Sequence, residues 1–490
     1  MNIIEPKNEP IIMNRTFYIV FTIILTIGIT SCNFETENYQ QTPTEQAYQT
    51  LQDVKNGMNG AYRALGSRQF LGNYALIYAD VCANITNGNS STGYFYSQSN
   101  WVIADTDNEM ENIWNYGYKV IDRCTRTIQG GKDILSKTSE KLLNEEEIAQ
   151  IKSYMAQCHA MKALANYYLV NYFALPYHKG IENLGIPLVK DLPIEPFTTV
   201  ERATVGKTYQ QITYDLEEAE KLTEECGIKP NAFYMGSMAI QALKARIYLD
   251  MGEYDIAQNA ALKAIELKGS GNGTGEDNVP TDEIYTSMWT SLAITSEDIF
   301  TIAKNESDNL ASYSLNNYYN GYGLTLTLQA INLFSPNDIR FGLVGENQYG
   351  STTTKYDGIP TSSVTSNIPI FRKSEMSLIV AETEARAGNI DNARNYLYYT
   401  AKRNKDITSA QMLPDSTDEL LQYIADERVR EFLGEGHRFF DARRMNLKIE
   451  LQNFDKPFDI ANFVFPIPAT EISAGFCTQQ NEGWETRLPQ

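Results

Sequence analysis

Apolar positions recur every three to four residues over much of this chain, which predicts a mostly helical protein. Residues 54–65 and 114–125 each place apolar side chains at this spacing. Residues 151–173 form a longer apolar run, whose alanines allow close packing between helices, and Pro176 marks its end. Each run predicts a helix with at least one face turned toward a core.

Two later segments resemble each other when Gly252 is aligned with Gly388. An alanine seven residues before each glycine, an aspartate three residues after it and an alanine five residues after it then coincide. The glycine permits a tight turn and the alanines allow close contact, so each segment predicts a tetratricopeptide-like helical hairpin. Nothing between the two segments matches either of them, which favours dispersed hairpins over a continuous solenoid.

A segment of different composition separates the two hairpins. Residues 269–369 are rich in Gly, Ser, Thr, Asn and Tyr, which predicts an irregular insertion of long loops and short strands. Residues 84–101 form an earlier loop of the same kind, and long loops of this composition often carry function. We therefore expect one domain over residues 47–490, with a helical scaffold at 47–268 and 370–445, this insertion, and a C-terminal segment at 446–490.

The N-terminal region has the pattern of a bacterial lipoprotein signal. An apolar run at residues 17–29 is too short to span a bilayer comfortably, and it is followed by two small polar residues and Cys32. The pattern predicts a signal peptide over residues 1–31, lipidation of Cys32 and a flexible tether over 32–46. Met13 is an alternative start of translation.

Composition narrows the possible functions. The formal charge of -20 repels phosphates, so nucleic acid is not expected as a partner. Six cysteines without paired short spacings and only three histidines predict neither a disulfide framework nor a metal site. No nucleotide-binding, zinc-protease or serine-hydrolase motif is present, and we expect neither a cofactor nor an enzyme. The 31 tyrosines suit sugars, because each offers a flat apolar face with a polar tip.

Charged residues dominate the stretch before residue 445. A capping pattern at Ser416 and Glu419 predicts the start of a helix there. Opposite charges lie three residues apart at Glu427 and Arg430, Arg428 and Glu431, Glu435 and Arg438, and Asp441 and Arg444. This spacing supports a helix, so we interpret His437 within it as a structural residue and not as a catalytic one.

Four features coincide in this chain: Cys32, the dispersed hairpins, the string ERVREFLGEGHRFFDARR at 427–444 and the string FPIPATEI at 465–472. Together they resemble the SusD/RagB family of nutrient-binding outer-membrane lipoproteins. The resemblance implies a mostly α, SusD-like fold and an outer-membrane, lipid-anchored protein that faces the cell exterior. It also implies capture of an oligosaccharide or polysaccharide fragment and its delivery to a TonB-dependent, SusC-like transporter. A peptide-binding relative, or a channel lid with no ligand affinity of its own, are the alternatives.

In this family the glycan platform tends to come from the early loop and from the insertion. By region, and not by motif, this selects eight residues of the present chain. They are Tyr94, Tyr96, Asn100 and Trp101 in the early loop, and Trp289, Tyr313, Asn317 and Tyr319 in the insertion. A glycan binder should leave several of these rings exposed, whereas a lid without ligand affinity should bury them.

Overall fold

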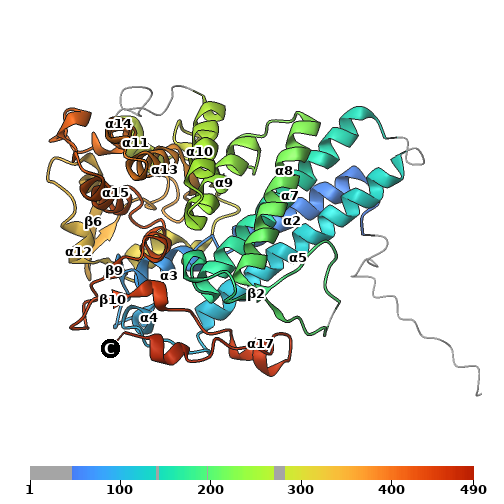
Figure 1. Cartoon of the computed structure of the whole chain (residues 1–490), viewed down its shortest axis with the longest axis horizontal. Coiled ribbons are helices and arrows are strands. Elements are labelled where there is room, and N and C mark those ends of the chain that lie inside the picture. The colour runs from blue at the N-terminus through green and yellow to red at the C-terminus, as the bar shows by residue number, and fades with distance from the viewer. Residues whose placement is uncertain (1–46, 139–142, 196, 270–281, 490) are drawn as a thin grey trace, which may run out of the picture. The chain divides into compact units, whose positions relative to one another are not determined.

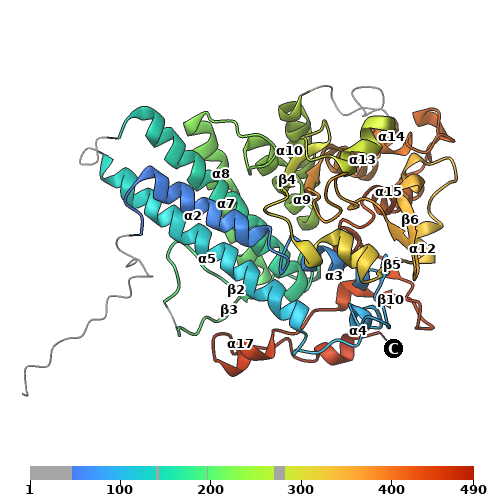
Figure 2. The ribbon, with the colours of Figure 1, turned by 180° about the vertical axis from the view of Figure 1, so that it is seen from behind.

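Four long helices form where the first half of the chain shows apolar patterns. They are α2 (Leu51–Leu65), α5 (Asn108–Ser136), α7 (Glu145–Phe173) and α8 (Val205–Cys226). In the computed structural model, which describes residues 47–138, 143–195, 197–269 and 282–489, α7 packs against each of the other three. Figures 1 and 2 show the four helices running side by side.

Helix α7 is the central element of this group. It begins with a capping box. The Asn144 side chain accepts from the Glu147 backbone amide, and the Glu147 carboxylate accepts from the Asn144 backbone amide. From Met155 onward, all its side chains are buried. A helix that is buried on all sides lies inside the core, and α7 is therefore covered by the helices around it, of which α2 and α5 also pack on each other.

Both glycine-centred hairpins form as predicted. They are α9 (Ser237–Met251) with α10 (Tyr254–Lys268), and α13 (Lys373–Arg386) with α14 (Ile390–Ala401). Gly252 and Gly388 each have a φ of 79°, which a residue with a side chain rarely adopts. Helix α10 packs directly on α13, so hairpins that are dispersed in the sequence are neighbours in space (Figure 1). Helix α15 (Thr417–Glu431) packs on α13 and α14.

The remaining elements are short. Five antiparallel pairs are β1 (Thr86–Asn87) with β5 (Thr325–Leu326), β2 (Leu184–Pro187) with β3 (Arg202–Thr204), β4 (Asp298–Ile302) with β8 (Ile368–Arg372), β6 (Val344–Asn347) with β7 (Gly350–Thr353), and β9 (Lys448–Ile449) with β10 (Phe458–Asp459). The shorter helices are α3 (Tyr74–Cys82), α4 (Tyr96–Ser99), α11 (Asp282–Ser287), α12 (Leu328–Ile331), α16 (Arg438–Arg444) and α17 (Ala469–Ser473). The predicted fold class, a mostly helical scaffold with an irregular insertion, is confirmed.

Two of the strand pairs position the insertion. Strand β4 pairs with β8, which leads directly into α13, so the two ends of the segment from β4 to β8 meet at the scaffold. Strand β1 of the early loop pairs with β5 of the insertion, with Thr86 opposite Leu326. These pairings bring together two irregular regions that lie far apart in the sequence.

A buried ionic network joins the insertion to the scaffold. Glu431, at the end of α15, accepts from Arg340, Arg372 and Arg403 at 2.7 to 3.1 Å. All four side chains are at most 2 % exposed. Burial opposes ionisation of Glu431, but the three guanidinium groups outweigh it and hold its pKa below the usual range.

The charge pairs expected at a spacing of three residues form in two cases out of the four. Glu427 pairs with Arg430 at 2.7 Å, and Asp441 pairs with Arg444 at 2.8 Å. Arg428 instead binds Asp441 at 2.7 Å. The other prediction is wrong in the same way, because Glu435 pairs with Lys355 and Arg372, and Arg438 donates to the Ala425 carbonyl. The new partners lie 13 residues away for Arg428 and Arg438, and in distant segments for Glu435.

The expected signal peptide, Cys32 and the tether lie outside the described residues. Residues 48–490 group into one compact unit. Within the described part of the chain, no helix is both long and apolar enough to cross a membrane.

We predict that Glu431→Gln lowers the free energy of unfolding by about 3–5 kcal/mol, because three buried guanidinium groups then lose their shared anion. Urea denaturation followed by circular dichroism measures this value. Glu224→Gln is the matched control, since Glu224 is exposed on α8 and should change stability by less than about 0.5 kcal/mol. Equal effects of the two substitutions would contradict a supporting role for the network.

A second prediction concerns Asp80 of α3, which is 1 % exposed and accepts from the Gly436 amide. Burial raises the pKa of Asp80 to about 8. Between about pH 4 and that value, the folded chain holds a proton that the unfolded chain has released, so this group makes stability fall as pH rises. Asp80→Asn keeps the acceptor and has no proton to lose.

Thermal unfolding of Asp80→Asn should therefore show a weaker decline in stability between pH 5 and pH 8 than the parent chain, and a higher midpoint at pH 8. Asp191→Asn serves as the control, because Asp191 is exposed. Identical pH profiles for the parent and Asp80→Asn would show that Asp80 is ionised in the folded protein.

Candidate functional site

Three tyrosines gather where the early loop meets the insertion. The rings of Tyr94 and Tyr322 stack, with centroids 3.9 Å apart and an angle of 19° between their planes. Tyr318 meets both rings edge-on, at 5.3 and 5.2 Å, and is itself buried. Tyr94 and Tyr322 are half-buried, so the stacked pair rests on the core through Tyr318 and keeps part of its surface open to solvent.

Backbone-directed hydrogen bonds fix the two loops to each other. The Asn89 amide donates to the Gly323 carbonyl at 3.1 Å, and the Thr92 hydroxyl donates to the Tyr322 carbonyl at 2.8 Å. A hydrogen bond with Tyr322 raises the pKa of Tyr94, which therefore keeps its proton at neutral pH. The stacked pair thus presents a hydroxyl group beside an apolar ring face, and its position is set by both loops.

Arg68 and Tyr313 extend this group on one side. The Arg68 guanidinium lies 3.4 Å from the centre of the Tyr313 ring, and the Asn73 amide donates to the Tyr313 carbonyl at 2.7 Å. Tyr313 is 38 % exposed. Among the described residues Arg68 forms no ion pair with a carboxylate, so the donors that it does not direct at Tyr313 are available to an acceptor from outside the chain. We refer to Tyr94, Tyr322, Tyr313 and Arg68 as the tyrosine cluster.

A short π-helix, η5 (Asn317–Gly321), carries Tyr318 and Tyr319, and Tyr322 follows it directly. Such a turn adds one residue per turn and is frequent at functional sites. Asn320 of this helix donates to Asp357 at 2.9 Å, and Asn316 lies 3.4 Å from the same carboxylate oxygen. Burial raises the pKa of Asp357, which the two amides oppose. The side of η5 that faces Asp357 therefore carries polar side chains, and it lies next to the tyrosine rings.

The structure distributes the eight predicted residues over four surroundings. Tyr94 and Tyr313 belong to the tyrosine cluster. Tyr96 is 46 % exposed but opens α4, and Asn100 donates to the Tyr96 carbonyl and accepts from Asn453 of the C-terminal segment. The second half of the early loop thus lies against the C-terminal segment and not against the insertion.

Three of the predicted rings are buried. Trp101 is 3 % exposed and packs edge-on against Phe458 and Phe463. Trp289, in η3 (Met288–Thr290), is 4 % exposed, and Tyr319 is fully buried. Their faces are covered by protein and leave no surface on which a sugar could stack. This corrects their predicted role to packing, since loop neighbours in the sequence did not reveal their burial.

Asn317 is half-buried and its amide donates to the Ser312 carbonyl. That bond holds the turn that precedes η5, so Asn317 supports the site from within. It completes the eight predicted residues.

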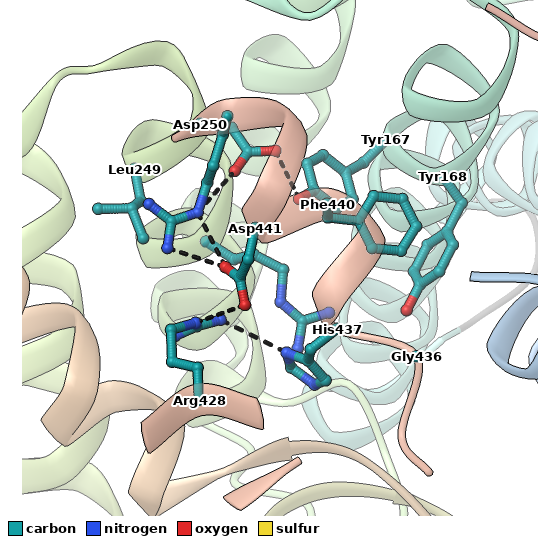
Figure 3. A pocket seen from close by; sticks show the side chains of 11 residues that line it. Tyr167, Tyr168, Leu249, Asp250, Arg428, Gly436, His437, Phe440 and Asp441 are labelled. Atoms are coloured by element: carbon teal, nitrogen blue, oxygen red, sulfur yellow. Dashed lines mark hydrogen bonds and ion pairs between the residues drawn. The ribbon is translucent and has the colours of Figure 1, made fainter. Parts of the chain in front are cut away.

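The cluster around His437 is unsuited to ligand binding. His437 stacks on Phe432 with centroids 4.2 Å apart, and burial lowers its pKa, as do nearby arginines. Figure 3 shows Arg428 directed at both His437 and Asp441. The enclosed space is about 10 Å³, room for at most one water molecule. The placement of His437 agrees with its interpretation as structural, and among the described residues no cluster of His, Cys, Asp or Glu could hold a metal ion.

Two family profiles match successive parts of the chain. The SusD family matches residues 300–484, and a family described as starch-binding and associating with the outer membrane matches residues 34–249. The chain belongs to the SusD family. Among curated proteins none matches it.

Solved structures of SusD proteins superpose over most of the chain. A SusD superfamily protein of Bacteroides thetaiotaomicron is 26% identical with a TM-score of 0.74, covering 88% of this chain and 100% of its own. A SusD superfamily protein of Bacteroides vulgatus is 25% identical with a TM-score of 0.76, covering 89% and 100%. A SusD-like carbohydrate-binding protein of the same species is 17% identical with a TM-score of 0.69, covering 90% and 98%, which shows the shared fold.

In this SusD-family chain, the regional prediction missed Arg68 and Tyr322. Tyr322 lies in the same run of tyrosines and asparagines as Tyr313, so composition carried a signal for it. Arg68 follows the end of α2 and has no sequence signal of its own, because only the fold brings it over the Tyr313 ring.

Proposed function

We propose that this chain captures an oligosaccharide or polysaccharide fragment at the cell surface and delivers it to a TonB-dependent, SusC-like transporter. The tyrosine cluster carries the proposal. Its partly open ring faces suit the apolar face of a sugar ring, and Arg68 and the tyrosine hydroxyls can bind sugar hydroxyl groups. A family description that includes starch binding and association with the outer membrane supports the same role.

Its location follows from the same proposal. Cys32 would carry the lipid anchor after removal of residues 1–31, and residues 32–46 would tether the folded part to the membrane. Several acyl chains on one N-terminus hold a protein firmly, whereas one chain binds only marginally. An outward-facing position would let the site meet polymer fragments before they reach the transporter. No catalytic step is part of the proposed role.

The lid without ligand affinity remains the second candidate, and a specific observation favours it. Trp101, Trp289 and Tyr319 are buried, as a lid would have them. Tyr94 and Tyr322 are only half-buried, and Tyr313 is 38 % exposed, so these rings keep surface open to solvent. Three partly open tyrosines beside an arginine without a carboxylate partner favour ligand binding over a purely mechanical role.

Calorimetric titration of the full-length chain tests the proposal, using plant, microbial and host oligosaccharides, both neutral and acidic, and mixed peptides. We predict saturable binding of one class of oligosaccharide. The double substitution Tyr94→Ala and Tyr322→Ala should weaken it on the order of tenfold or more, since ring contacts contribute about 0.5–1.5 kcal/mol each.

Tyr214→Ala is the matched control, because Tyr214 is similarly exposed, at 39 %, on α8. It should leave the affinity unchanged. Binding of peptides alone would replace the glycan role with the peptide-binding alternative, and silence across both panels would favour the lid.

A further inference from the structure

A groove of about 640 Å³ opens beside the tyrosine cluster, between the end of α2, the turn before α9 and strand β4. Its floor and one wall are aromatic. Tyr62 meets Tyr234 edge-on, with ring centroids 5.7 Å apart, and Phe300 lies behind Tyr62 at 6.4 Å. Tyr234 is 40 % exposed, so one ring of this wall is open. A volume of this size accommodates one or more sugar rings.

The Tyr62 ring is held firmly. Its hydroxyl donates to Gln157 at 2.9 Å and accepts from the Met235 amide at 2.7 Å. Gln157 belongs to α7, and Met235 belongs to the turn that carries Tyr234. The wall is therefore fixed to the central helix before any ligand arrives, which reduces the entropy lost on binding.

Two stretches of chain connect the groove to the tyrosine cluster. Ser67 lines the groove and is followed directly by Arg68. Leu310 also lines it, and its carbonyl accepts from the Tyr313 amide at 2.8 Å. The contact of Arg68 with Tyr313, at 3.4 Å, thus lies where the groove and the cluster meet.

Positive charge collects at this place in a chain whose formal charge is -20. Arg63 and Lys304 line the groove, and Arg68 lies at its end, against one acidic lining residue, Asp308. Asp308 lies 4.0 Å from the Lys304 ammonium group and its side chain is 72% exposed, so it is a weak partner. The exposed Arg63 forms no ion pair among the described residues.

Lys304 has the features of a recognition group. Its side chain is 7% exposed, and its ammonium group donates to the Gly66 carbonyl at 3.2 Å. An ammonium group has three donors, so this bond leaves others for a ligand. Burial lowers the pKa of Lys304, and an anionic partner would favour its charged form.

We propose that this groove binds a sugar unit that carries a negative charge, as a carboxylate or a sulfate, and that the protein therefore selects acidic glycans. The inference rests on the proposed function. The tyrosine cluster binds the oligosaccharide, and the groove binds the one sugar unit that carries the negative charge. Aromatic faces supply contact with the ring, while Arg63 and Lys304 supply the counter-charge.

Titration of the full-length chain with oligogalacturonate and with its fully methyl-esterified counterpart tests the proposal, since the two differ in charge but not in backbone. A sulfated galactan oligomer and its desulfated form make the parallel test for sulfate. We expect the charged member of one pair to bind on the order of tenfold more tightly at low salt. Raising the NaCl concentration from 50 to 500 mM should weaken only the charged ligand.

Arg63→Gln should remove a large part of the preference and leave the uncharged ligand unaffected. Lys55→Gln is the matched control, because Lys55 is exposed on the same helix and does not line the groove. Preference for the charged ligand that survives Arg63→Gln undiminished would overturn the placement in the groove.

Equal binding of both members of each pair, independent of salt, would overturn the inference and leave the proposed function intact. Failure of every saccharide to bind would instead remove the proposed function, and the inference with it. The salt series requires no substitution, so it decides the question even where a variant folds poorly.

Discussion

Burial of charge is the constraint on which the rest of this structure depends. Glu431 at the end of α15 is shared by three arginines that come from the insertion, from β8 and from the turn after α14. A buried ion is tolerated only when it is paired and hydrogen-bonded, so none of these segments can leave without stranding a charge. The network therefore contributes less to net stability than to specificity, because the segments can assemble only in the arrangement that pairs all of these charges.

The same condition reaches the candidate site. Glu435, four residues beyond Glu431, binds Lys355 at 2.7 Å, and the neighbouring Tyr356 donates to the Gly434 carbonyl. Tyr356 stacks with Tyr319 of η5 at 6.4 Å. The π-helix that presents one side of the tyrosine cluster is thus attached, through a short series of buried contacts, to the C-terminal charged string. The charged string at 427–444 can therefore support the candidate site although it lies far from that site.

The helical scaffold could be predicted because its signals are local. Apolar spacing marked α2, α5 and α7, and two glycines marked the hairpin turns. The site could be predicted only in part, since exposure depends on what packs against a loop. Trp101 has polar neighbours in the sequence and is nevertheless covered by Phe458 and Phe463, which lie more than 350 residues away. Two of the charge pairs predicted in the string at 427–444 are wrong, because Arg428 binds Asp441, 13 residues further along, and Glu435 binds Lys355 of the insertion.

Electrostatics links the surface of the molecule to its site. An acidic surface repels acidic polymers, so a chain of charge -20 can bind one only where local positive charge outweighs the general repulsion. The end of α2 provides such a place, because Arg63 and Arg68 lie on either side of Ser67 and the loop after β4 adds Lys304. Repulsion elsewhere then contributes to specificity, since an acidic glycan has few other places to bind. The groove therefore offers local positive charge to an anionic sugar on an otherwise acidic chain.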